Sequence, residues 1–138
     1  QQEWSENLNI NVSLINQEWK TYLNTRREHD FEVARAGWIG DYQDPNTFLD
    51  MFLAGGAMNG GQYDNPEYDR LIKKAAMMEA GPGRMAVLRQ AEDHFITNDA
   101  GVIPIYTYVT KNMIDRGKWG GWHNNTMDYH PPKNLFKK

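Results

Sequence analysis

The sequence contains 138 residues, of which 40% are hydrophobic and 24% are charged. These proportions are typical of one water-soluble domain with a hydrophobic core. The formal net charge is −3 and the basic residues are scattered, so no positive surface for a nucleic-acid backbone is indicated. The chain has no cysteine, which excludes disulfides, thiolate nucleophiles and Cys-ligated zinc. No apolar run is long enough to span a membrane.

The first 38 residues predict a strand, a helix and a second strand. Apolar and polar residues alternate over residues 8–14, as in a strand with one buried face. Asn16 is a suitable N-cap for a helix that carries Trp19, Tyr22, Leu23 and Arg26 on one face. Residues 31–38 then predict another strand. This order and length are those of a right-handed βαβ unit with parallel strands.

The central part of the chain predicts helices separated by a glycine-rich connection. Asp44 and Pro45 favour the start of a short helix that runs to about Leu53. Residues 54–61 contain too many glycines for regular structure and predict a mobile loop. Two further helices are expected to begin at Pro66 and Pro82 and to pack on the sheet. Their apolar faces comprise Tyr68, Leu71, Ile72, Ala75 and Ala76 in the first, and Met85, Leu88, Ala91 and Phe95 in the second.

Residues 102–109 are rich in β-branched and aromatic residues and predict a strand, with Pro104 at an edge or a bulge. Periodicity ends after Lys111. The tail contains large aromatic residues, including Trp119 and Trp122, among glycine, asparagine and proline. We expect these rings to pack on something outside the chain.

Because the sequence has no initiator methionine and opens on a helix-like segment, we also expect it to be part of a longer protein.

The loop after the second predicted strand is the best candidate binding site. In open α/β sheets, ligands bind beyond the carboxyl ends of parallel strands. Trp38, Gly40 and Asp41 lie at such an end, with Arg35 just before them. They offer an aromatic face, a close backbone approach, a carboxylate and a guanidinium. The alternative is that Trp38 belongs to the core and that Asp41 and Arg35 form a surface ion pair.

Residues 31–50, which run from Phe31 to Asp50, closely resemble the ligand-binding segment of periplasmic oligopeptide-binding proteins. The resemblance extends through residues 16–21, 63–66 and 103–108, and fades after Lys111. It implies the C-terminal part of a solute-binding protein of the peptide/nickel-binding family, which delivers solutes to an ABC importer.

The resemblance implies roles for individual residues. Asp41 matches the aspartate that pairs with the α-ammonium of the bound peptide, and Gly37 and Ile39 lie where the backbone pairs with the peptide. These roles agree with main-chain recognition of peptides of any sequence. The other implied site residues are two arginines for peptide carboxylates and three aromatic residues of side-chain pockets: Arg26, Arg35, Trp19, Trp38 and Tyr108. Thr107 interrupts the family's run of tyrosines there.

We therefore expect an α/β fold with a mixed sheet, a parallel βαβ unit and flanking helices, forming part of one lobe of a two-lobed clamp. Residues 1–110 would belong to the C-terminal lobe, and residues 111–138 would return toward a first lobe outside the chain. The expected partners are a short peptide and the membrane permease subunits of the importer. The expected location is the periplasm, or the outer face of the cytoplasmic membrane for a lipoprotein. The alternative is another solute on the same fold: a dipeptide, a nickel complex, haem or a sugar.

Catalysis and metal binding have little support in the sequence. Asp41 and Asp44 are close, but Asp44 before Pro45 is better explained as a helix cap. The four histidines show no metal-ligand spacing. We expect no enzymatic activity, no metal site and no cofactor.

Overall fold

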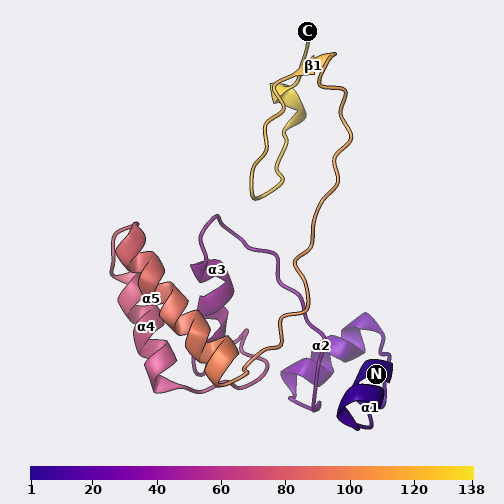
Figure 1. Cartoon of the computed structure of the whole chain (residues 1–138), viewed down its shortest axis with the longest axis vertical. Helices are drawn as coiled ribbons and strands as arrows, with labels where there is room; N and C mark the ends of the chain where they lie inside the picture. The colour runs from indigo at the N-terminus through magenta and orange to yellow at the C-terminus, as the bar shows by residue number, and fades with distance from the viewer. The chain divides into compact units, whose positions relative to one another are not determined.

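A computed structural model describes all residues, 1–138, and divides into two compact units, Gln1–Ala36 and Gly37–Lys138 (Figure 1). Each unit is described by itself. The second unit contains the principal hydrophobic core.

The first unit consists of two short helices joined by irregular chain. Helix α1 spans Gln2–Leu8 and ends at Asn9, which adopts a left-handed conformation with φ 53°. Helix α2 spans Trp19–Arg27, and neither helix has a buried residue. The cap of α2 is Glu18, which accepts hydrogen bonds from the amides of Lys20 and Thr21 at 2.9 and 3.3 Å. Our assignment of the cap to Asn16 is therefore wrong.

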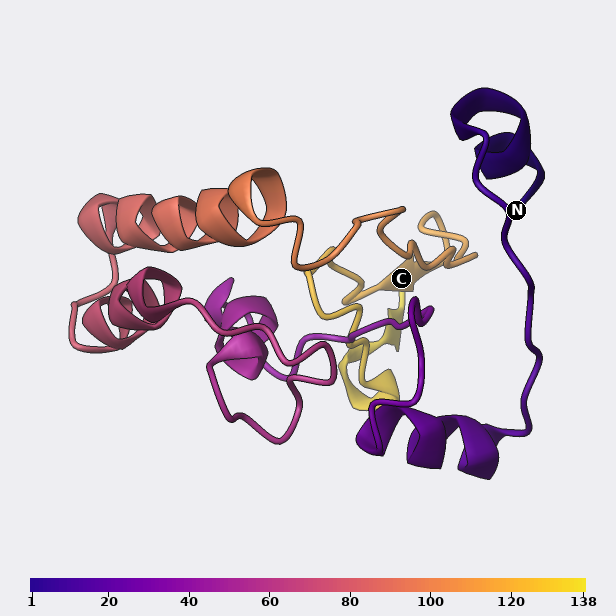
Figure 2. The same cartoon turned by 90° about the horizontal axis from the view of Figure 1, so that it is seen from below.

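The second unit is built around a pair of neighbouring helices. Helix α4 spans Pro66–Ala76 and α5 spans Pro82–Glu92, and α5 continues as a π-helix, η2, over Asp93–Asn98. Helix α3, Asn46–Leu49, and the 3₁₀ helix η1, Asp50–Phe52, precede them. Helices α4 and α5 lie side by side, and α3 contacts α5 (Figure 2). The core residues are Leu49, Tyr68, Leu71, Ile72, Ala75, Val87, Leu88, Ala91 and Phe95.

The helix starts at Pro66 and Pro82 are confirmed. Asn65 caps α4 by accepting hydrogen bonds from the amides of Glu67 and Tyr68 at 2.9 and 3.2 Å. Most of the predicted apolar faces are buried, but Ala76 and Met85 are exposed, whereas Val87, which we did not place on a face, is buried. The prediction that both helices pack on a sheet is wrong here, because they pack on each other and on α3.

The expected mixed sheet with a parallel βαβ unit is absent from this structure. The only ladder joins β1, Trp119–Gly120, to β2, Phe136–Lys137, in antiparallel register. Residues 9–14, 31–38 and 102–109 form no strand, and Leu8 belongs to α1. A strand requires hydrogen-bonded partners as well as an apolar face. These segments have β-like composition but no partner strand within the 138 residues.

The tail is held by close backbone contacts. The 3₁₀ helix η3, Pro132–Asn134, leads into β2. Gly121 has φ 82°, and a Cβ atom there would overlap the carbonyl of Asn134. Trp119 remains 44% exposed, while Trp122 is partly buried and stacks on His130 with ring centroids 3.7 Å apart. Neither indole is fully enclosed by the chain.

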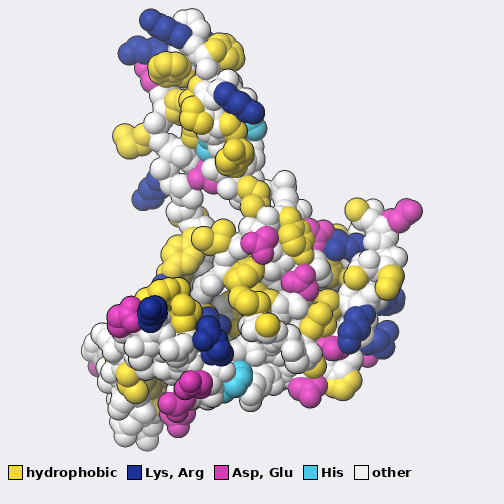
Figure 3. Space-filling view, turned by 180° about the vertical axis from the view of Figure 1, so that it is seen from behind, with side chains coloured by type: hydrophobic (Ala, Val, Ile, Leu, Met, Phe, Trp, Pro, Cys, Tyr) yellow, Lys and Arg dark blue, Asp and Glu magenta, His cyan; other side chains and the backbone are white.

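Many large hydrophobic side chains are exposed at the surface (Figure 3). They include Leu14, Ile15, Ile105, Tyr108 and Val109, which lie in the segments predicted to be strands or next to them. None of the helices has both the length and the hydrophobicity that crossing a bilayer demands.

Candidate ligand-binding site

A cavity of about 310 Å³ lies in the second unit, beside the loop of Trp38 and Asp41 that was predicted as a binding site. Its walls come from that loop, from α3 and η1, and from the glycine-rich connection. The lining residues are Trp38, Asp41, Tyr42, Thr47, Asp50, Met51, Gly56, Ala57 and Met58. The only charged side chains among them are the carboxylates of Asp41 and Asp50, and the rest are aromatic, thioether or small. Such a lining suits a cationic group attached to an apolar body.

Asp41 lies at an accessible wall of this cavity. Its side chain is exposed, and its carboxylate has no hydrogen-bond or ion-pair partner in the chain. Its backbone amide donates a 3.0 Å hydrogen bond to the hydroxyl of Thr47, which is 2% exposed. The loop backbone is thereby tied to α3 while the carboxylate stays free. This arrangement can accept an ammonium group with little rearrangement.

A second wall is formed by a network around Asp50. The Tyr42 hydroxyl donates a hydrogen bond to the Asp50 carboxylate at 3.1 Å. The side-chain amide of Asn46 donates to the same carboxylate at 3.0 Å and to the Tyr42 hydroxyl oxygen at 3.2 Å. Burial, together with the neighbouring Asp50 charge, raises the pKa of Tyr42, so the phenol stays protonated as a donor. Asp50 is thus oriented by two hydrogen-bond donors.

Asp44 closes the loop by an ion pair with α5. The guanidinium of Arg84 contacts its two oxygens at 2.6 and 3.0 Å. The hydrogen bonds from Arg84 lower the pKa of the Asp44 carboxyl. The Asp44 carboxylate also accepts a 2.9 Å hydrogen bond from the backbone amide of Asn46. Helix α3 nevertheless begins at Asn46, and its N-cap position is Pro45, without a side-chain cap. Our assignment of the N-cap to Asp44 and of the first helical position to Pro45 is therefore wrong by one residue, and Asp44 instead anchors the loop.

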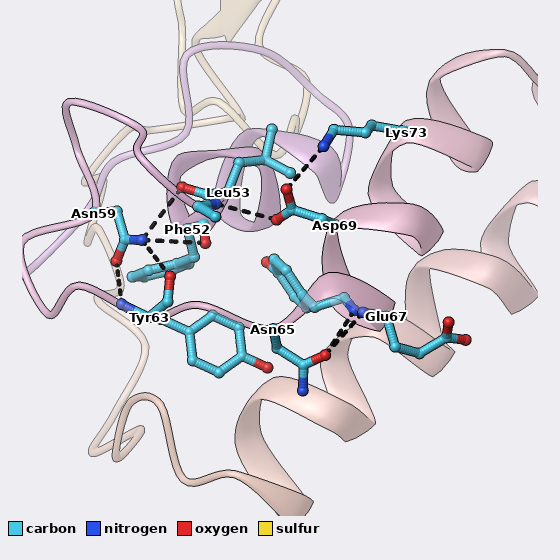
Figure 4. A network of polar contacts seen from close by, with 10 residues as sticks. Phe52, Leu53, Asn59, Tyr63, Asn65, Glu67, Asp69 and Lys73 are labelled. Atoms are coloured by element: carbon cyan, nitrogen blue, oxygen red, sulfur yellow. Dashed lines mark hydrogen bonds and ion pairs between the residues drawn. The ribbon is translucent and has the colours of Figure 1, made fainter.

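The glycine-rich side of the cavity is organised by one buried side chain, Asn59. Its amide group donates to the carbonyls of Leu53 and Tyr63 at 3.2 and 2.7 Å, and its oxygen accepts from the Tyr63 amide at 2.9 Å (Figure 4). A weaker contact reaches the Phe52 carbonyl at 3.4 Å. These bonds give residues 54–61 a defined path, although they lack regular structure.

The other residues predicted next to Asp41 lie in the same unit. Trp38 lines the cavity, and its buried indole N–H has no acceptor. Gly37 lies under the ring of Tyr108, which would be 3.8 Å from a Cβ atom at that glycine. The side chain of Ile39 is exposed. The structure therefore brings Trp38 to Asp41, and Tyr108 to the backbone at Gly37.

Trp19, Arg26 and Arg35 belong to the first unit, where they surround Tyr22. Trp19 stacks on Tyr22 with centroids 5.4 Å apart, and the Arg26 guanidinium lies 5.8 Å from the centre of the same ring. The Tyr22 hydroxyl donates to the Arg35 carbonyl at 2.6 Å. Sequence reasoning treated Tyr22 only as part of a buried stripe and missed this central position.

Sequence reasoning also missed Tyr42, Asp50, Asn59 and Arg84. Tyr42 and Asp50 lie in residues 31–50, the segment that resembles a ligand-binding segment, but a spacing of eight residues is not a recognisable motif. Asn59 is one polar residue in a run of glycines, and Arg84 lies 40 positions from its partner. Only the folded chain shows these relationships.

The chain is similar to known proteins along most of its length. Residues 1–60 match the family described as bacterial extracellular solute-binding proteins, family 5 Middle. Periplasmic oligopeptide-binding protein OppA of Escherichia coli (strain K12) is 33% identical over 133 residues, which are 96% of this chain and 24% of that protein. The chain is homologous to part of the periplasmic oligopeptide-binding proteins.

Solved structures of such binding proteins agree with this relationship. The unliganded open form of the periplasmic murein tripeptide-binding protein MppA superposes with a TM-score of 0.87 at 33% identity, over 99% of this chain and 26% of that one. Haemophilus influenzae OppA, in complex with the peptide RPPGFSPFR, gives a TM-score of 0.79 at 34% identity, over 99% of this chain and 27% of that one. All three are named as peptide-binding proteins. The chain spans about a quarter of the length of these oligopeptide-binding relatives.

Proposed function

We propose that the chain is a segment of a periplasmic solute-binding protein that captures short peptides and delivers them to an ABC importer. The observation that carries the proposal is the Asp41 carboxylate, which lines the cavity and has no partner in the chain. An exposed carboxylate beside an aromatic wall suits the α-ammonium and first side chain of a peptide. The relatives and their names support this assignment.

In the proposed complex, Asp41 pairs with the α-ammonium, and the backbone around Gly37 and Ile39 pairs with the peptide main chain. Trp38, Tyr108 and Trp19 contribute to side-chain pockets. Arg35 and Arg26 donate hydrogen bonds to peptide carboxylates. Main-chain pairing explains how one site can hold peptides of different sequence. The protein acts as a binding component, with the membrane permease subunits as its partners.

The proposal also accounts for the segments that form no strand here. In the longer protein, residues 9–14, 31–38 and 102–109 would pair with each other or with further strands, and complete a mixed sheet with a parallel βαβ unit. Residues 1–110 would then belong to one lobe of a two-lobed clamp, and residues 111–138 would return toward the other lobe. Exposed hydrophobic residues in and beside these segments support this view. The periplasm, or the outer face of the cytoplasmic membrane for a lipoprotein, is the proposed location.

The decisive experiment replaces Asp41 by Asn in the longer protein and measures peptide affinity by calorimetry. Binding of tri- and tetrapeptides with a free N-terminus should weaken by roughly 2–5 kcal/mol, because a desolvated ammonium loses its partner. N-acetylated peptides should bind poorly to both forms. Glu79→Gln, at an exposed position between α4 and α5, is the matched carboxylate-to-amide control. Equal affinity of the unaltered protein for free and acetylated peptides would remove Asp41 from the site.

A further inference from the structure

The three guanidinium nitrogens of Arg84 all donate hydrogen bonds, and they connect α5 to α4 and to the loop that contains Asp44. It lies in the first turn of α5, and its Nη1 and Nη2 atoms contact the Asp44 carboxylate at 2.6 and 3.0 Å. Its Nε atom donates to the Ala75 carbonyl, near the end of α4, at 3.1 Å. The planar fork of arginine suits such simultaneous contacts, which lysine cannot reproduce.

A short chain of hydrogen bonds continues from Asp44 to Asp41. The carbonyl of Asp44 accepts from the Thr47 amide at 3.2 Å, and the Thr47 hydroxyl accepts from the Asp41 amide at 3.0 Å. Gly40 lies against the same threonine, because a Cβ atom there would be 3.0 Å from the Thr47 methyl group. The backbone that presents the Asp41 carboxylate is therefore anchored, through Thr47 and Asp44, to α5.

The pair of Arg84 and Asp44 is the least exposed of the ion pairs that involve a lysine or an arginine. The side chains of Arg84 and Asp44 are 14% and 29% exposed, whereas those of Arg70 and Glu67, a similar bidentate pair on α4, are 58% and 46% exposed. A partly desolvated pair with fixed geometry holds its position more firmly than an exposed pair. Arg84 does not line the cavity, so it has no direct contact with a ligand there.

We propose that Arg84 is a positioning residue for peptide recognition, acting through Asp44 and Thr47 to hold the loop that presents Asp41. This inference rests on the proposed function. Without the anchor, the loop must be ordered when the ammonium binds, and ordering a few groups reduces affinity by up to about tenfold. The loss falls on the interaction with the N-terminus, so it should affect peptides with a free ammonium more than acetylated ones.

The test compares three variants of the longer protein: Arg84→Gln, Arg84→Lys and, as the matched control, Arg70→Gln. The measured quantity is the ratio of affinities for a free tripeptide and its N-acetylated form, together with the melting temperature. Arg84→Gln should lower the ratio by about tenfold, Arg84→Lys by less, and Arg70→Gln not at all. If Arg84→Gln fails to fold, the ratio measured on Arg84→Lys decides.

A folded Arg84→Gln or Arg84→Lys variant with the ratio of the unaltered protein would overturn the positioning role. So would an equal loss for both peptides, which indicates a structural role only. If the unaltered protein itself does not discriminate between free and acetylated peptides, the proposed function fails before Arg84 is considered. The two failures are therefore distinguishable.

Discussion

Tyr68 donates a hydrogen bond from its buried hydroxyl to the backbone carbonyl of Leu49, with 2.5 Å between the oxygens. The tyrosine is completely buried in the core, and its ring packs against Tyr63 and Phe95. The bond joins α4 to the end of α3, so it connects the helix pair to the wall of the cavity.

Replacing Tyr68 by Phe should lower the free energy of unfolding by about 1–3 kcal/mol, because the Leu49 carbonyl loses its donor in a buried place. Tyr63→Phe is the matched control, since the Tyr63 hydroxyl bonds to the exposed Asp99. Urea denaturation compares the two variants. An equal effect of both would show that burial of the Leu49 contact is unimportant.

Asn59 and Asn125 make the same local motif in different surroundings. Asn125 accepts from the Tyr129 amide at 3.0 Å and donates to the Tyr129 carbonyl at 3.1 Å, just as Asn59 bonds both groups of Tyr63. Asn59 is buried and has further carbonyl partners, whereas Asn125 is only partly buried. We expect Asn59→Ala to cost about 2–3 kcal/mol of unfolding free energy and Asn125→Ala less than about 1 kcal/mol. Thermal unfolding of both variants tests this order, and a larger loss for Asn125→Ala would contradict it.

The ion pair of Asp44 predicts a loss of stability in acid. Its carboxyl pKa is lowered in the folded chain from the ordinary value of 3.8. A group with a lowered folded pKa stabilises the fold above its unfolded pKa, and this contribution disappears as the pH falls through the folded pKa. The difference in unfolding free energy between the unaltered chain and Asp44→Asn should thus be constant near neutrality and shrink below about pH 4. Denaturation at several pH values measures it. A difference that stays constant down to about pH 2 would contradict the assignment.

The 138-residue chain should bind peptides more weakly than the longer protein. It spans about a quarter of the length of its relatives, so one face of a bound peptide would remain in water and much of its backbone would lack partners. Calorimetry with tri- and tetrapeptides on both proteins tests this expectation. Sub-micromolar binding to the 138-residue chain would show that the cavity beside Asp41 suffices.

Local signals in the sequence predicted the helices well. Asn65 before Pro66 specifies a cap and a first helical residue, and the apolar spacing that follows matches the buried face of α4. The strands depended on partners that no local pattern can supply, so residues 9–14, 31–38 and 102–109 remained unpaired. The site was nominated by the position of Trp38 and Asp41, which do line one cavity. Its supporting contacts could not be predicted, because Arg84 and Asp44 meet only through the packing of α5 beside α3.

The packing of α3, α4 and α5 has a consequence for the order of folding. Their core is made from residues 49–95, which follow one another with short connections. Contacts between segments that are close in sequence form rapidly, whereas strand pairing over long separations is slow. We therefore expect this helical group to form early, before the segments on either side of it find their partners. The loop that contains Asp41 would then attach to helices that are already packed, and the binding site would form last.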